Sequence, residues 1–529
     1  MEASILQICF ASLVLLFIWF WAFHFCNVMI LKPQKIRETL RRQGIEGPQP
    51  SFFYGNLLEV QRVQREGLKA AKRSDGEMSH NHLHTIYPGV ESWSKKYGKT
   101  FTYSLGKTVV LNVVDPNLLK EINSYKGLEL GKSEQQRKDW KALVGDSIAW
   151  TSGSTWQYQR KVIQPTLYPE KVKGMVDPIV KSTLPVLKSW EDRIRNEGGV
   201  ADIRIDEDLE NLFADVISRA CFGSTYAQGE KIFLKLRELR RLISSRAFSI
   251  GGQGWSYIPT KRNLAISKLE KEIESLIMKM VEDQKKKPTP ENHLLESLLD
   301  AATICHTEME ARTRFTVDNC KAIYLAGHSP PMVATGWTLL LLATNQDWQD
   351  RCRAEVLEAC GDRFPDANSI YKLKAICPYI SCYPCLQLTM VIHESLRLYP
   401  PSSYMFREAV EDMHLGGIFV PKGLTLLVPI TMVHLDPDIW GHDVDKFKPE
   451  RFDNGVMAAS KYPHTYLPFG LGSRVCLGQH FAMAEMKVVL ALFLSKFSLS
   501  VSPQYRHSIQ TRQWAMVPEY GINILMKRL

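Results

Sequence analysis

A cysteine in a glycine-rich loop just before an apolar helix is the feature that most constrains this chain. Residues 468–478 read PFGLGSRVCLG, and the segment that follows repeats its apolar residues at helical spacing. The amides and the positive dipole end of a first helical turn stabilise a thiolate at Cys476. The glycines permit the unusual dihedral angles of a loop that lies flat against a planar group. A ligating thiolate is therefore predicted, and the alternative is an ordinary buried cysteine.

This loop resembles the haem-binding loop of the cytochrome P-450 superfamily, in which Phe, two Gly, Arg, Cys and a further Gly stand at these spacings. The matching positions are Phe469, Gly470, Gly472, Arg474, Cys476 and Gly478. The resemblance implies haem b with Cys476 as the axial ligand of its iron, Phe469 shielding the sulfur and Arg474 pairing with a haem propionate. It also implies the mostly α fold of that family, with small β-sheets.

Two segments upstream of the loop match further family motifs. HESLRLYPP, residues 393–401, places Glu394 and Arg397 three residues apart on one helix face. FKPERF, residues 447–452, supplies Arg451 as the third member of the family's buried Glu–Arg–Arg network. A network in low dielectric must be fully paired to avoid a large desolvation penalty, so a structural role is expected.

The resemblance also implies further contacts to the haem propionates. GSTWQYQRKVIQP, residues 153–165, spaces Trp156 and Arg160 by four, as in the family segment that holds the second propionate. Arg407, ten residues beyond Arg397, matches another propionate position. Without the resemblance, the first segment would be an ordinary amphipathic helix start.

The family pattern fails in the long helix expected above the haem. Members usually carry Ala or Gly, Gly, any residue, Asp or Glu, Thr, and Thr or Ser, whereas residues 326–331 here read AGHSPP. Ser329 takes the acid position and Pro330 the first threonine position, although that pair normally organises water and delivers protons. Ser329 and His328 are the candidate catalytic replacements, beside ordered water or a polar group of the substrate. Pro330 and Pro331 predict a kink.

The N-terminus predicts a single transmembrane helix. Residues 3–31 contain no Asp, Glu, Lys or Arg and are long enough to cross a bilayer, without the basic start and cleavage site of a signal peptide. Basic residues follow the span at once, so the body should face the cytosol. The expected organisation is a transmembrane anchor at 1–31, a basic and Pro/Gly-rich tether at 32–60 and a haem-thiolate catalytic domain at 61–529, held at the endoplasmic reticulum membrane.

Periodicity places the remaining elements. A β-hairpin is expected from Trp93 to Pro116, and short strands near 404–430 and in the last thirty residues. Helices are expected near 167–200, 205–222, 228–247, 262–286, 313–345 and 346–360. The histidine-rich residues 79–84 indicate a solvated loop rather than a metal site. The cysteine-rich residues 376–385 indicate a surface insertion, or an artefact of gene assembly, rather than an iron–sulfur site.

The charge and composition of the chain limit the classes of partner that it can have. The net charge of +10 is spread along the chain, which argues against nucleic-acid binding. A basic haem-side surface that includes Lys161 would suit an acidic redox partner. No GxGxxG fingerprint follows a predicted strand, so NADPH would act only through a separate reductase. The odd, irregularly spaced cysteines favour a reducing compartment.

Residues 40–56 and 326–356 resemble the plant clan that includes gibberellin, brassinosteroid and cytokinin oxidases, above all its gibberellin- and terpenoid-oxidising branch. The resemblance implies a reductase-dependent monooxygenase that hydroxylates or epoxidises a lipophilic terpenoid such as a gibberellin-type diterpenoid. The alternatives are a haem-thiolate isomerase or dehydratase acting on a peroxide, and a catalytically silent haem-binding relative. Family substrate-contact regions match Ser402, Ser403, Tyr404, Met405, Trp514, Ala515 and Met516.

Overall fold

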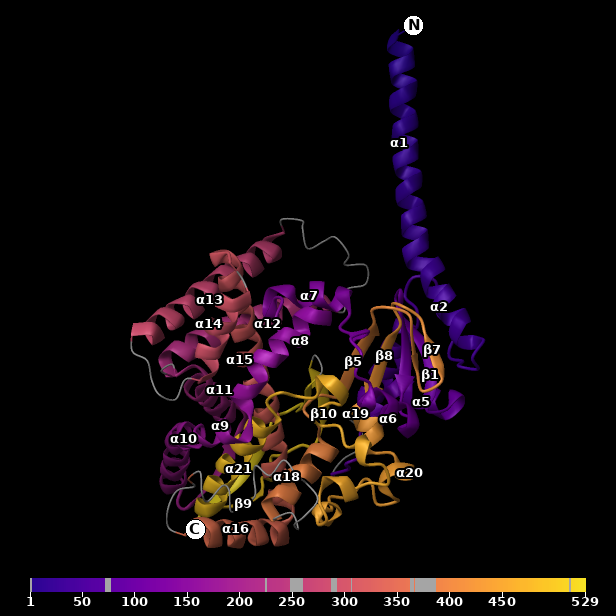
Figure 1. The fold of residues 1–529 in the computed structure, drawn as a ribbon. Helices are drawn as coiled ribbons and strands as arrows, with labels where there is room; N and C mark the ends of the chain where they lie inside the picture. The colour runs from indigo at the N-terminus through magenta and orange to yellow at the C-terminus, as the bar shows by residue number, and fades with distance from the viewer. Residues whose placement is uncertain are drawn as a thin grey trace.

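The fold is mostly helical with small sheets, as predicted (Figure 1). The computed structural model describes residues 2–71, 78–223, 226–247, 260–286, 293–305, 307–361, 366, 387–512 and 515–529. The helices over these ranges are α1 (Glu2–Cys26), α2 (Lys32–Arg41), α3 (Leu57–Ala71), α4 (Leu83–Ile86), α5 (Pro88–Tyr97), α6 (Pro116–Ser124), α7 (Glu134–Val144), α8 (Gly153–Ile163), α9 (Pro169–Lys173), α10 (Val176–Asn196), α11 (Asp206–Phe222), α12 (Tyr226–Ala247), α13 (Lys261–Lys286), α14 (His293–Cys305), α15 (Met309–Thr344), α16 (Gln346–Cys360), α18 (Gln387–Leu398), α19 (Ile430–His434), α20 (Pro437–Trp440) and α21 (Gln479–Lys496).

The strands form small sheets at the sides of the helical body. The largest has the order β1-β2-β8-β5-β3, a second has the order β4-β12-β9, and β10-β11 and β6-β7 are hairpins. The strands are β1 (Thr100–Leu105), β2 (Thr108–Val113), β3 (Leu130–Gly131), β4 (Val200–Arg204), β5 (Tyr404–Ala409), β6 (Met413–Leu415), β7 (Ile418–Val420), β8 (Thr425–Pro429), β9 (Phe497–Val501), β10 (Ile509–Arg512), β11 (Ala515–Pro518) and β12 (Asn523–Arg528).

The predicted hairpin exists but begins later than expected. β1 and β2 pair antiparallel with Leu105 opposite Thr108, and the two-residue turn places Gly106 at φ 59°, a conformation that favours glycine. Trp93 lies instead in α5, where it packs in the core. Each helix expected between residues 167 and 360 is present, with the first divided into α9 and α10. The expectation for residues 376–385 lies outside the described residues.

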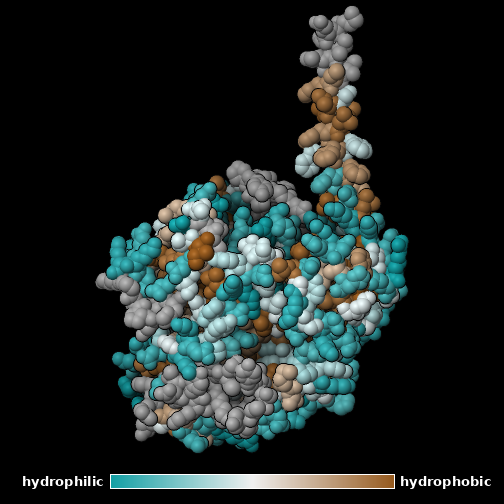
Figure 2. Space-filling view, in the orientation of Figure 1, coloured by the Kyte–Doolittle hydropathy of each residue, from teal (hydrophilic) through white to brown (hydrophobic). Residues whose placement is uncertain are grey.

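The anchor helix leaves the body, and its apolar surface is uncovered (Figures 1 and 2). Among the described residues, the continuous helix Cys9–Arg41 is the one long and apolar enough to cross a membrane. The segment expected as a tether is not a free linker. Its first part is α2, and its later part is hydrogen-bonded to β1, where the Thr102 amide donates to Glu46 O at 2.9 Å. A Cβ on Gly47 would lie 1.7 Å from Thr102 O, so only glycine fits this approach.

The histidine-rich segment is only partly solvated: Ser79, Asn81 and His84 are exposed, as expected of a solvated loop, whereas His82 is buried. His82 is buried and stacks on Tyr399 with ring centroids 5.3 Å apart, and His80 Nδ1 lies 2.6 Å from the Tyr399 hydroxyl. Trp337 of α15 also stacks on Tyr399, with ring centroids 4.1 Å apart. The segment therefore packs over the end of α18 through aromatic contacts.

Candidate active site

The cysteine loop has the geometry expected of a ligand loop. Gly470 and Gly472 have φ of 76° and 71°, a region that glycine adopts readily, and a Cβ on Gly472 would lie 2.8 Å from Ile122 O. The Cys476 amide donates to Phe469 O at 2.8 Å, which folds the loop back on itself. Gly478 caps α21, and beyond its two chain neighbours no described residue comes within 4 Å of the position that a Cβ would take.

Cys476 is accessible although it lies deep in the fold. Its side chain is exposed, yet burial within the protein raises the pKa of the thiol, and only the Gly478 amide and the Arg160 charge oppose that rise. A side chain that is both accessible and desolvated faces an interior space. α15 also borders an interior space, because its Ala326 and Pro330 are exposed while most of the helix is buried.

Four cations gather beside the loop. Arg474 lies over the Trp156 ring with its guanidinium carbon 4.3 Å from the centroid, and Arg160 lies 5.7 Å from the same centroid. Burial, with the charges of Arg407 and Arg160, lowers the pKa of Arg474 to about 9. Burial alone lowers the pKa of Arg407 to about 10. Burial, with the charges of Arg407 and Arg474, also lowers the pKa of Lys132 well below its usual range.

Among the described residues, the three arginines of this cluster donate to neutral carbonyl groups. Arg407 donates to Phe406 O at 2.8 Å, Arg474 to Thr151 O at 2.8 Å, and Arg160 to Val475 O at 3.0 Å. No carboxylate of the described residues forms an ion pair with them. Buried like charges without a counter-ion are costly, so the cluster requires a ligand with more than one negative charge. The two propionates of a haem bound at Cys476 fit this requirement.

The three members of the predicted Glu–Arg–Arg network lie together, and Glu394 and Arg397 are fully buried. Arg397 Nε and Nη2 each donate to a Glu394 oxygen at 2.7 Å, and both side chains are 0% exposed. Arg451 Nε lies 3.5 Å from Glu394 Oε1 without hydrogen-bond geometry. Its stronger partner is Asp443, 2.7 Å from Nη2, which sequence reasoning missed. Because Asp443 precedes FKPERF and belongs to no family motif, only the fold reveals it.

His434 was also missed, and it links this network to the cysteine loop. Its Nε2 accepts from the Leu467 amide at 2.8 Å, so Nδ1 carries the proton and donates to Arg397 O at 3.0 Å. Burial and the Arg397 charge lower the pKa of His434 to about 3, which keeps the ring neutral and its tautomer fixed. The imidazole thus links the segment before the loop to the end of α18.

α15 brings a different face to the site from the one that carries His328. His328 Nε2 lies 3.0 Å from Glu210 O of α11, and its ring lies 4.8 Å from that of Phe233 of α12. Two residues correspond to about 200° around a helix, so His328 cannot share the exposed face of Ala326 and Pro330. The structure therefore contradicts the candidate catalytic assignment of His328. Ser329 is half-buried.

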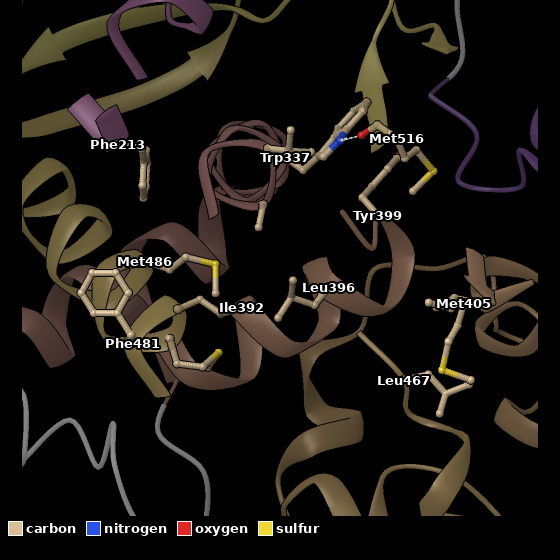
Figure 3. Close-up of a cluster of buried hydrophobic side chains, with 14 of the residues drawn as sticks. Phe213, Trp337, Ile392, Leu396, Tyr399, Met405, Leu467, Phe481, Met486 and Met516 are labelled. Atoms are coloured by element: carbon tan, nitrogen blue, oxygen red, sulfur yellow. Dashed lines mark hydrogen bonds between the residues drawn. The ribbon is translucent and has the colours of Figure 1, made fainter. Parts of the chain in front are cut away.

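The residues expected in the substrate pocket lie on opposite sides of β5, because side chains alternate along a strand. Met405 and Arg407 point to the same side of β5, and the Met405 sulfur lies 3.8 Å from the position of a Cβ on Gly470. Figure 3 shows Met405 beside Leu467, the residue that leads into the loop. Tyr404 points to the other side, where its hydroxyl donates to Ile86 O at 3.3 Å.

Ser403 is also placed away from the site. It is 0% exposed, and its carbonyl accepts from the Tyr87 hydroxyl. Ser403 and Tyr404 are therefore packing residues, which corrects that part of the prediction. Ala515 is half-buried and bridges to Ser402, and the carbonyl of its neighbour Met516 accepts from the Trp337 indole at 2.9 Å (Figure 3). Trp514 lies outside the described residues.

Comparison with known proteins agrees with a haem-binding site at Cys476. The family model described as Cytochrome P450 matches residues 77–526. The chain is similar to Cytochrome P450 714C3 from Oryza sativa subsp. japonica, with 43% identity over 96% of each chain. It is 39% identical to Cytochrome P450 714B3 from Zea mays, over 96% of this chain and 94% of that protein, and 38% identical to Cytochrome P450 714A2 from Arabidopsis thaliana, over 95% of each. The chain belongs to the cytochrome P450 family, whose members are haem-dependent monooxygenases.

Proposed function

We propose that this enzyme hydroxylates or epoxidises a lipophilic terpenoid, of the gibberellin diterpenoid type, with electrons from NADPH delivered by a separate reductase. The observation that carries the proposal is the exposed face of α15. Ala326 and Pro330 present a small, apolar surface in the interior, where Met405 and Ala515 are the other candidate contacts. Pockets for lipophilic ligands are mostly apolar with few polar groups. The resemblance of residues 40–56 and 326–356 to the gibberellin-oxidising branch supplies the substrate class.

The residues at the site have separate proposed roles. Cys476 would ligate the haem iron, and a thiolate ligand supplies electron density that favours cleavage of the O–O bond. Phe469 and Gly478 would line the loop, and Trp156, Arg160, Arg407 and Arg474 would hold the propionates. Lys132, which joins their charge cluster, is a further candidate for that role.

The proposed setting is the endoplasmic reticulum membrane, with residues 1–31 as a single-pass anchor and the catalytic domain in the cytosol. The exposed apolar surface of α1 and the basic residues that follow it support this orientation. Lys161 is exposed on α8, next in sequence to Arg160, and is a candidate contact for an acidic reductase.

The test is an oxygen-accounting assay on the full-length chain in membranes. Gibberellin acids and their terpenoid precursors are incubated with NADPH, reductase and ¹⁸O₂, and products are analysed by mass spectrometry, with Cys476→Ala as the matched control. A monooxygenase places one ¹⁸O atom in the product only when NADPH and reductase are present. Absence of turnover of every terpenoid, with normal haem content, would exclude the proposed substrate class.

A second candidate function is considered because Pro330 stands where the family usually has the alcohol of the proton-delivery pair. A haem-thiolate isomerase or dehydratase rearranges a peroxide and needs neither proton relay nor reductase. In the same assay such an enzyme would convert an organic hydroperoxide without NADPH, and the product would contain no ¹⁸O from the gas. A catalytically silent relative would convert neither substrate.

A further inference from the structure

We propose that Tyr399 is a redox-active tyrosine, which gives one electron to an oxidised Trp337 while its phenolic proton passes to His80. The inference starts from three contacts. The Trp337 and Tyr399 rings stack with centroids 4.1 Å apart and planes 10° apart. The Tyr399 hydroxyl lies 2.6 Å from His80 Nδ1. The Trp337 indole donates to Met516 O at 2.9 Å (Figure 3).

Trp337 lies on the part of α15 that leads away from the site. It follows Pro330 by seven residues, which is about two helical turns, or about 10 Å along the axis, on nearly the same face. Pro330 is exposed toward the interior space, whereas Trp337 is fully buried. The indole is also held by Met516, the neighbour of the candidate pocket residue Ala515. Trp337 therefore connects the helix face that borders the site with Tyr399.

The partner of the Tyr399 hydroxyl is a base. Burial, with the charges of His507 and Arg397, lowers the pKa of His80 to about 4. The ring is therefore neutral at physiological pH, and its Nδ1 can accept the phenolic hydrogen. Tyr399 is fully buried, whereas His80 is half-buried and its two chain neighbours are exposed. Because a phenol that has lost an electron is a strong acid and histidine is an effective proton shuttle, His80 gives this proton a way out of the core.

The hydrogen bonds decide where the oxidised state settles. The carbonyl that meets the Trp337 N–H accepts a hydrogen bond but no proton, so an oxidised Trp337 keeps its positive charge in the core, where charge is costly. Transfer of one electron from Tyr399 to Trp337 removes that charge. The Tyr399 O–H bond breaks and an N–H bond forms at His80, which leaves a neutral indole, a neutral tyrosyl radical and an imidazolium. The negative charge of Asp445 favours the imidazolium.

Two other tyrosines show what is particular to Tyr399. The Tyr404 hydroxyl donates to Ile86 O at 3.3 Å, so its described partner cannot take a proton. Tyr466 lies 2.9 Å from His393 Nδ1, but its hydroxyl also donates to His393 O at 3.1 Å. Tyr399 combines a basic partner with a tryptophan stacked in parallel. Tyr404 therefore supplies the matched control.

The consequence is protection of the site. When no substrate takes up an oxidising equivalent, one electron leaves Trp337 and is replaced from Tyr399, so the damage is moved away from Cys476. An external thiol or ascorbate then returns one electron to the tyrosyl radical, and the imidazolium returns the proton. The inference rests on haem binding at Cys476 and not on the terpenoid class of the substrate.

The test is rapid-freeze electron paramagnetic resonance on the haem-loaded full chain in detergent. The protein is mixed with an organic hydroperoxide, which supplies the oxidant without NADPH, reductase or terpenoid. Ring-deuterated tyrosine identifies a tyrosyl radical by the collapse of its hyperfine splitting. A ¹⁵N-histidine sample shows whether an imidazole is hydrogen-bonded to the radical. The variants are Tyr399→Phe, His80→Gln and Trp337→Phe, with Tyr404→Phe as the control.

The wild type should show a tyrosyl radical coupled to histidine ¹⁵N. Tyr399→Phe should lose this radical and Tyr404→Phe should keep it. His80→Gln should also lose it, because an amide oxygen accepts a hydrogen bond but is not a base. Trp337→Phe keeps a ring on Tyr399 but should slow the appearance of the radical. The haem absorption should decay faster under peroxide in Tyr399→Phe than in Tyr404→Phe.

An unchanged radical in Tyr399→Phe or in His80→Gln would overturn the proposal. So would loss of the radical in Tyr505→Phe, because Tyr505 contacts His507 Nδ1 at 2.8 Å and is the competing site. A wild type without any tyrosyl radical, or with one that lacks histidine coupling, would refute it without recourse to a variant. That last measurement stands even if a substitution destabilises the fold, which thermal unfolding of each variant would reveal.

Discussion

Acid should destabilise this protein steeply below pH 6.5, because several histidines are buried in the neutral state. His82, His328 and His434 are each less than a tenth exposed. Burial lowers their pKa values to about 3, 4 and 3 respectively. The unfolded chain binds these protons near pH 6.5, before the folded chain does. Their contribution to stability is therefore complete above pH 6.5 and is lost as pH falls toward 4.

The magnitude follows from linkage. Each histidine changes the free energy of unfolding by about 1.4 kcal/mol per pH unit in this window. Integrated from pH 6.5 to pH 5, the loss is about 1.6 kcal/mol per histidine, or about 5 kcal/mol for the three. Because folded domains are stable by only about 5–15 kcal/mol, the loss should be plain in an equilibrium measurement.

The assay is urea unfolding of the full chain in detergent, followed by tryptophan fluorescence at pH 7, 6 and 5. His82→Phe keeps a ring against Tyr399 but removes two ring nitrogens that have no hydrogen-bond partner. The slope of the unfolding free energy with pH should therefore fall by the share of one histidine, about 1.4 kcal/mol per pH unit. The exposed His414 supplies the control substitution, His414→Phe. A free energy of unfolding that stays flat between pH 7 and 5, or equal slopes in wild type and His82→Phe, would refute the reasoning.

Three further outcomes test the scaffold. Glu394→Gln leaves Arg397 buried without its acid and should lower the free energy of unfolding by about 3–5 kcal/mol; a loss below 1 kcal/mol in urea titration would contradict a buried pair. Arg407→Met removes a buried cation that has no carboxylate partner, so haem content after gel filtration should fall while the haem-free chain melts no lower than the wild type. Gly327→Ala brings a Cβ against Ile217 and should cost about 1–3 kcal/mol by thermal unfolding, with recovery in the double variant that carries Ile217→Ala.

Long periodic segments were predictable, whereas polar or interrupted ones were not. α10, α11, α13 and α15 repeat apolar residues over many turns, so sequence alone placed them closely. α7 was missed because its sequence EQQRKDWKALV is mostly polar, although Ser133 at its N-cap is a start signal that could have found it. The partners of the cation cluster come from distant segments, and no local pattern predicts that Lys132 joins Arg407 and Arg474.

Two of the three corrected site residues, Tyr404 and His328, could have been excluded from periodicity alone. Once Arg407 is expected to face the haem, the two-residue alternation of a strand places Met405 on the same side and Tyr404 on the other, as β5 shows. By the same reasoning, a helix that turns Ala326 and Pro330 toward the site turns His328 away.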